Sequence, residues 1–96
     1  MSDFKDLFNS DLVSDDIRAE IDLEVSLIGK LIEAREQKGM TQARLAELTG
    51  LKQSAIARLE TMSTTPKIDT MIKLLKPLGY TLAIVPDTSP MQRQNL

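Results

Sequence analysis

The chain of 96 residues contains no cysteine, no histidine and no tryptophan. Without cysteine it can form neither disulfides nor thiolate zinc sites, which suits a reducing compartment. Without histidine it lacks the commonest general base, the usual partner of a serine nucleophile and the imidazole ligand of metal sites. We therefore expect no bound metal, no cofactor and no enzymatic activity.

Long apolar runs are also missing. No stretch approaches the roughly 20 apolar residues that a membrane span needs, and no signal-peptide pattern opens the chain. Aromatic residues are only 3% of the chain although 42% is apolar, so Leu, Ile and Met must supply most of the core. This composition predicts one small cytoplasmic domain that binds a partner and has no membrane association.

The net charge of the chain is −2, but the charges are distributed unevenly along it. Residues 1–24 hold eight acidic and two basic residues, a net charge of −6, whereas residues 25–96 hold six acidic and ten basic residues, a net charge of +4. An acidic arm joined to a basic body suggests two partners of opposite charge. The alternative is that the acids only keep a small protein soluble or cap helices. Net negative charge does not exclude DNA binding, because only the contacting face must be positive.

Apolar spacing and helix-capping residues predict a series of helices. We expect them over residues 3–9, 15–38, 42–49, 53–60 and 68–76, with the second either continuous or broken near Asp22. Pro77 should end the last of them. The apolar pattern of the third and fifth helices predicts inward side chains at Leu45, Ala46, Leu48, Ile68, Met71, Ile72 and Leu75.

Strand-forming residues follow, over 80–85, and Pro86 ends the run. A lone strand needs a partner for its backbone hydrogen bonds. The simplest partner is the same segment of a second copy, paired antiparallel about a twofold axis. The segment could instead pack as extended chain on its own domain or pair with a different protein. Residues 87–96 lack periodicity and are predicted to be a disordered tail.

Residues 41–60 carry the pattern that a helix-turn-helix requires. Ala46 is small where two helices cross, Gly50 tolerates a left-handed turn, and Leu51 can plug the core. Ile56 and Leu59 would anchor the second helix from below. The outward positions are then of types that read base edges and phosphates, unless they form an ordinary solvated face: Gln53, Ser54, Ala57 and Arg58.

The sequence Thr-Gln-x-x-Leu-Ala-x-x-x-Gly-Leu at residues 41–51, followed by Ile56, Leu59 and Glu60, resembles the Xre (Cro/C1) helix-turn-helix family over roughly residues 25–80. This resemblance implies an all-α, five-helix, lambda-repressor-like domain with an N-terminal helical arm and a short C-terminal β-strand at residues 81–86. It also implies a structural ion pair between Arg35 and Glu60, with Gln42 gripping a phosphate. The DNA-binding residues implied are Thr41, Gln42, Lys52, Gln53, Ser54, Ala57, Arg58, Thr61 and Thr64.

Two positions depart from the family pattern. Lys52 stands where the family usually has Ser or Thr as the N-cap of the recognition helix, and loss of such a cap costs about 0.5–2 kcal/mol. The glycine usual after that helix is absent from residues 62–66. We therefore expect Lys52 to contact a phosphate instead, and the exit from the helix to be shaped differently.

A closer resemblance, carried by residues 31–42, 66–70 and 78–82, is to HigA-type antitoxins. It implies that the arm of residues 1–24 binds a small basic ribonuclease toxin of the RelE/HigB type, and that a homodimer represses its own operon at operator DNA. The toxin-binding residues would be Phe4, Leu7, Phe8, Leu12, Asp15 and Asp16. The strand resembles that of HipB-type antitoxins, where it joins the dimer, here through Tyr80, Leu82 and Ile84. A stand-alone phage-type repressor, or an adaptor that has lost DNA binding, remains the alternative.

Overall fold

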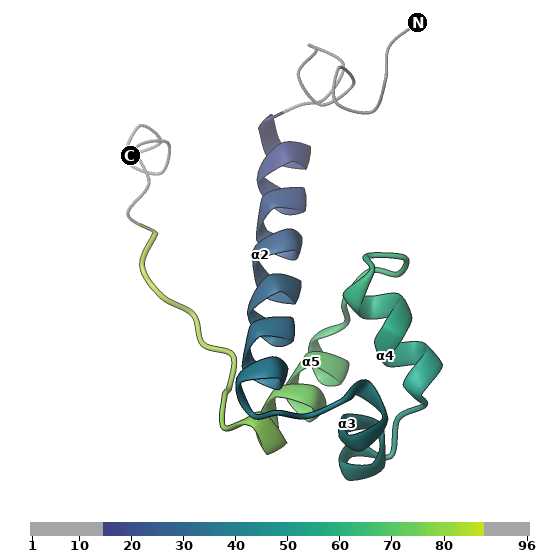
Figure 1. Cartoon of the computed structure of the whole chain (residues 1–96). Helices are drawn as coiled ribbons and strands as arrows, with labels where there is room; N and C mark the ends of the chain where they lie inside the picture. The colour runs from purple at the N-terminus through teal and green to yellow at the C-terminus, as the bar shows by residue number, and fades with distance from the viewer. Residues whose placement is uncertain (1–14, 88–96) are drawn as a thin grey trace, which may run out of the picture.

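The computed structural model describes residues 15–87 (Figure 1). Within this range the chain forms four α-helices and one 3-10 turn. The helix expected over residues 3–9 lies outside the described residues, so the five-helix count is not confirmed. The elements are α2 (Asp15–Gln37), α3 (Gln42–Thr49), α4 (Gln53–Glu60), α5 (Ile68–Leu75) and η1 (Lys76–Leu78).

Helix α2 is continuous and much longer than the others, so the expected alternative of a break near Asp22 does not occur. Its first turn holds Asp15 and Asp16, whose negative charge is favourable at the positive end of the helix dipole. Helices α3, α4 and α5 gather around its C-terminal half, while its N-terminal half extends beyond them (Figure 1). Residues 15–24 therefore belong to the same helix as the residues that enter the core.

The core is made where these four helices meet. From α2 only the C-terminal half contributes buried side chains, and Leu23 and Val25 are 67% and 54% exposed. The buried apolar residues are Ile28, Leu31, Ala34, Leu45, Ile56, Leu59, Met71, Leu74, Leu75 and Leu78. Within residues 15–87, no helix is long and apolar enough to cross a membrane.

The predicted inward faces of α3 and α5 are partly wrong. Leu48 is 44% exposed, Ile72 is 46% exposed and Ile68 is 73% exposed, whereas Leu74, which was not predicted, is fully buried. Each of these helices has only eight residues. A helix this short with apolar residues around much of its circumference can bury more than one face, and its neighbours decide which. Leu45, Met71 and Leu75 are buried as predicted.

The strand expected at residues 81–86 is not confirmed. Residues 80–87 form no β-ladder within the part of the chain that is described, because that part offers no second strand to pair with. Tyr80 donates its backbone N–H to Leu75, and Leu82 packs against the core. Beyond Leu82 the segment leaves the body, and Ile84 and Val85 are exposed.

The different burial of two leucines on α3 gives a direct test of the core. Leu45→Ala should lower the free energy of unfolding by about 2–5 kcal/mol, because it leaves a cavity among fully buried side chains. Leu48→Ala is the matched control on the same helix, and it should cost less than about 1 kcal/mol because that side chain is half exposed. Urea unfolding measures both. Equal losses in the two variants would contradict the assigned orientation of α3.

Candidate nucleic-acid interface

The turn between α3 and α4 is closed by local hydrogen bonds. Thr41 caps α3, since its Oγ1 accepts the backbone N–H of Arg44 at 3.0 Å. Gly50 ends α3 with a φ of 77°, a left-handed conformation that costs other residues about 1–2 kcal/mol, and donates its N–H to Ala46 at 2.9 Å. Leu51 then packs against the core as expected. The bend between α3 and α4 is therefore fixed by local interactions of the residues that form it.

The orientation of α4 follows from its buried side. Ile56 and Leu59 are 1% and 4% exposed, which turns the opposite side of the helix to solvent. The exposed residues there are Gln53, Ser54 and Arg58, with Ala57 partly buried between them. Within residues 15–87, Arg58 makes no ion pair. The predicted reading residues thus share one side of one short helix.

Lys52 precedes α4 in extended backbone geometry and makes no side-chain capping bond. Its side chain is exposed next to Gln53. No side chain therefore caps the backbone N–H groups at the N-terminus of α4, and the positive side chain of Lys52 lies beside them. Both features favour a phosphate at this end of the helix.

A buried ion pair joins α2 to the end of α4. Arg35 Nε donates to Glu60 Oε2 at 2.7 Å and Arg35 Nη2 donates to Glu60 Oε1 at 2.8 Å, a bidentate arrangement. The two side chains are 11% and 5% exposed. Arg35 Nη1 also donates to the carbonyl of Met40 at 2.9 Å, so the guanidinium holds the α2–α3 connection as well. The pairing of Arg35 with Glu60 that the resemblance implied is thus present in the structure.

Gln42 is a third member of this network, which sequence reasoning missed. Its Nε2 donates to Glu60 Oε1 at 2.9 Å, so the side chain expected to grip a phosphate is held by a carboxylate of α4. An amide nitrogen carries two hydrogens, and the second is left for another acceptor. No spacing in the sequence relates residue 42 to residue 60, so only the packing of the helices could reveal this bond.

The charges in this network perturb each other's ionisation. Burial alone would raise the pKa of Glu60, but the hydrogen bonds from Arg35 and Gln42 and the positive charge of Arg35 together lower it below its ordinary value. The hydrogen bond with Glu60 raises the pKa of Arg35, which more than offsets the lowering effect of burial. Both groups are therefore charged at neutral pH.

Of the two threonines after α4 that were expected to touch the DNA backbone, Thr61 is hydrogen-bonded within the protein. Thr61 Oγ1 donates to the carbonyl of Ala57 at 3.0 Å or of Arg58 at 3.1 Å, and lies 2.9 Å from Ser63 Oγ. Thr64 lines a pocket between α4 and α5. Both residues remain exposed, so a further contact is open to them.

The chain leaves α4 without the glycine that the family usually has there. Met62 takes a φ of 63°, the left-handed conformation that a glycine would supply at less cost. The backbone closes as a Schellman motif, with Met62 N–H donating to Leu59 at 3.1 Å and Ser63 N–H donating to Arg58 at 2.8 Å. A methionine thus takes a backbone conformation that favours glycine.

Of the residues expected to bind the toxin, only Asp15 and Asp16 are described. Both are exposed in the first turn of α2. The remaining four, Phe4, Leu7, Phe8 and Leu12, lie outside the described residues. Within residues 15–87, no cluster of acidic side chains is arranged to hold a metal ion.

The buried ion pair should be visible in the acid stability of the protein. A carboxylate whose pKa is lowered on folding contributes stability above its unfolded pKa, and this contribution is lost as pH falls through the folded pKa. We expect the free energy of unfolding to fall below about pH 4.3. Glu60→Ala should cost about 3 kcal/mol at pH 7, because it leaves Arg35 buried without its partner.

Glu47 provides the matched control, since it pairs with Arg44 in a largely exposed position. Glu47→Ala should change the free energy of unfolding by less than about 1 kcal/mol. Chemical unfolding at pH 7 and at pH 3 measures both variants. A loss in Glu60→Ala no larger than that in Glu47→Ala would contradict the role given to the buried pair.

Comparison with known proteins agrees with this geometry. The helix-turn-helix family matches residues 31–85. An uncharacterized HTH-type transcriptional regulator of Haemophilus influenzae is 44% identical over 79 residues, which are 82% of this chain and 81% of that protein. The HTH-type transcriptional regulator PuuR of Escherichia coli is 46% identical over 54 residues, 56% of this chain but only 29% of PuuR.

A solved structure is similar over almost the whole chain. It is a toxin–antitoxin module from Streptococcus pneumoniae, 44% identical, with a TM-score of 0.66, and the match covers 90% of this chain and 94% of that one. The Thr41 cap, the Gly50 turn and the buried Leu45, Ile56 and Leu59 fit the family pattern, whereas Lys52 and the missing glycine after α4 depart from it. The chain therefore belongs to the Xre-type helix-turn-helix family of DNA-binding transcriptional regulators.

Proposed function

We propose that this protein is a sequence-specific DNA-binding antitoxin that neutralises a small basic ribonuclease toxin of the RelE/HigB type and represses its own operon. The observation that carries the DNA-binding part is the exposed side of α4, held in place by buried residues beneath it. The antitoxin part is supported by the similarity to the Streptococcus pneumoniae toxin–antitoxin module across nearly the full chain. The alternative is a stand-alone repressor without a toxin.

In this proposal α4 enters the major groove. Gln53, Ser54 and Arg58 read base edges, and the methyl group of Ala57 contacts a thymine methyl. The exposed charged residues of the segment from 41 to 67 favour a polyanion, because four are basic and one is acidic: Arg44, Lys52, Arg58, Lys67 and Glu47.

Phosphate contacts would flank the reading residues. Lys52 supplies a positive charge at the start of α4, and Gln42 offers the amide hydrogen that Glu60 does not occupy. Because Glu60 lies at the end of α4, a phosphate held by Gln42 would sit at a fixed position relative to the reading side. Thr41, Thr61 and Thr64 would touch the backbone nearby.

A homodimer would present two copies of α4 to successive major grooves, about 34 Å apart on a palindromic operator. The segment with Tyr80, Leu82 and Ile84 is the proposed dimer contact. Its exposed apolar side chains support this assignment, since Tyr80 is 54% exposed and Ile84 has no cover at all. Pairing with the same segment of a second copy would also satisfy its backbone hydrogen bonds.

The toxin would bind at the N-terminal end. The described part of the arm, residues 15–24, holds five acidic residues and one basic residue and exposes Leu23. This surface is complementary to a basic protein with an apolar groove. The sequence preceding it adds Phe4, Leu7, Phe8 and Leu12. The DNA-facing side of α4 and this end of α2 are separate parts of the molecule (Figure 1).

Arg58 tests the DNA-binding part. Arg58→Ala should weaken binding to the promoter region upstream of the gene by about 1–3 kcal/mol if Arg58 reads a base. Arg58→Lys keeps the charge but loses the planar fork, so it should lose most of the preference for operator over random DNA while retaining random-DNA affinity. Fluorescence anisotropy at two salt concentrations measures the affinity for operator and for random DNA. The binding stoichiometry should be two chains per operator site. Equal losses on operator and random DNA would make Arg58 a phosphate contact only.

Removing residues 1–14 tests the antitoxin part while leaving α2 intact. We expect the truncated protein to lose binding to the product of the adjacent small basic reading frame, yet to retain operator affinity within about twofold, because every residue of α2, α3 and α4 remains. Co-purification and anisotropy measure the two activities. A truncation that still captures the neighbour would contradict the proposed role of the arm. The absence of any such neighbouring frame would favour the stand-alone repressor.

A further inference from the structure

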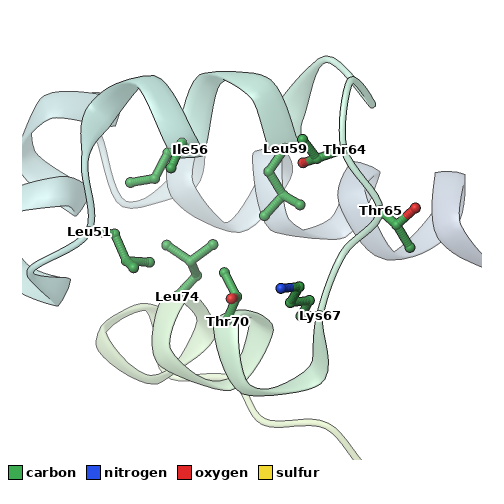
Figure 2. Close-up of a pocket in the computed structure, with 9 residues that line it drawn as sticks. Leu51, Ile56, Leu59, Thr64, Thr65, Lys67, Thr70 and Leu74 are labelled. Atoms are coloured by element: carbon green, nitrogen blue, oxygen red, sulfur yellow. The ribbon is translucent and has the colours of Figure 1, made fainter.

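A pocket lies between α4 and α5, on the side of α4 that faces away from the reading residues (Figure 2). Its volume is about 230 Å³. The walls are apolar: Ile56 and Leu59 reach into it from α4, Leu74 from α5, and Leu51 from the turn. Ile56, Leu59 and Leu74 are at most 4% exposed and form its floor, so the apolar surface open to a ligand comes mainly from the partly buried Leu51 and the exposed Ala55.

The mouth of the pocket is polar and positively charged. Lys67 lies at the start of α5, and in Figure 2 its amine points toward Thr70 and the space between Leu59 and Leu74. Thr64 and Thr65 add hydroxyl groups at the rim. None of the residues that line the pocket is acidic, and Lys67 makes no ion pair within residues 15–87. An ammonium group thus faces an apolar pocket without a counter-charge.

We propose that this pocket binds a small amphipathic anion, an aliphatic carboxylate of about six carbons. The apolar tail would lie against Leu51 and Ala55, over the buried floor of Ile56, Leu59 and Leu74, where its burial is favourable. The carboxylate would pair with the Lys67 ammonium and accept a hydrogen bond from the Thr70 hydroxyl. Charge decides between this ligand and a neutral apolar one, since only an anion is complementary to the mouth of the pocket.

The size of the ligand follows from the volume. A pocket of about 230 Å³ is smaller than the ~300–1,000 Å³ typical of sites for drug-sized molecules. At about 30 Å³ for each water-sized group it holds about eight non-hydrogen atoms. Hexanoate is of about this size. A ligand this small should bind with a dissociation constant of about 1 mM.

The test is a titration of the full-length, ¹⁵N-labelled protein with sodium hexanoate, followed by amide chemical shifts. We expect saturable shifts at Leu51, Ile56, Leu59 and Thr70. Lys67→Met should weaken the affinity about fivefold or more, because it removes the charge and keeps the length of the side chain. Lys67 is exposed, so this variant should fold normally. Lys73→Met is the matched control on α5 outside the pocket, and its affinity should equal that of the unmodified protein.

Two further ligands separate charge from apolar contact. Hexanamide keeps the tail without the charge and acetate keeps the charge without the tail, and each should bind at least about fivefold more weakly than hexanoate. Hexanamide binding as tightly as hexanoate would overturn the proposal in favour of a neutral apolar ligand. Equal effects of Lys67→Met and Lys73→Met, or shifts that do not saturate, would overturn it outright. The experiment contains neither DNA nor toxin, so its result is independent of the function proposed above.

Discussion

The bidentate ion pair between Arg35 and Glu60 is the interaction on which the arrangement of this domain depends. It joins the longest helix to the end of α4, while Gln42 and the carbonyl of Met40 connect the same two charges to the start of α3. An unpaired charge in this position would be costly, so each member requires the other. Together with the burial of Ile56 and Leu59 in the core, the pair leaves α4 only one side to expose.

This dependence matters because α4 is weak as an isolated element. It has eight residues, no side-chain cap at Lys52 and a methionine in left-handed geometry just after its end. Isolated helices of this length are unstable in water, so its stability must come from tertiary contacts. In the proposed function, the free N–H groups at the uncapped start of α4 and the charge of Lys52 would bind a phosphate.

The two halves of helix α2 have different surroundings. Its C-terminal half supplies Ile28, Leu31, Ala34 and the Arg35 guanidinium to the domain, and its N-terminal half extends outward with acidic and apolar side chains. A continuous helix is a stiff connection between these halves. In the proposed function, the toxin would engage the N-terminal half of α2, while the C-terminal half helps to hold α4, which would engage DNA.

The sequence by itself determined the start of α3, the glycine turn and the position of the residues proposed to read DNA, because these depend on local chemistry: a threonine cap at Thr41 and a left-handed glycine at Gly50. Pro77 does not end the helical run as expected, since Lys76 is helical and Pro77 lies within the 3-10 turn that follows α5. The resemblance to the Xre family also identified the pairing of Arg35 with Glu60. The tertiary structure alone decided that Leu48, Ile68 and Ile72 face solvent, that Leu74 enters the core, and that Gln42 donates to Glu60. The rotation of an eight-residue helix about its axis depends on the neighbours it packs against, and those neighbours are distant in the sequence.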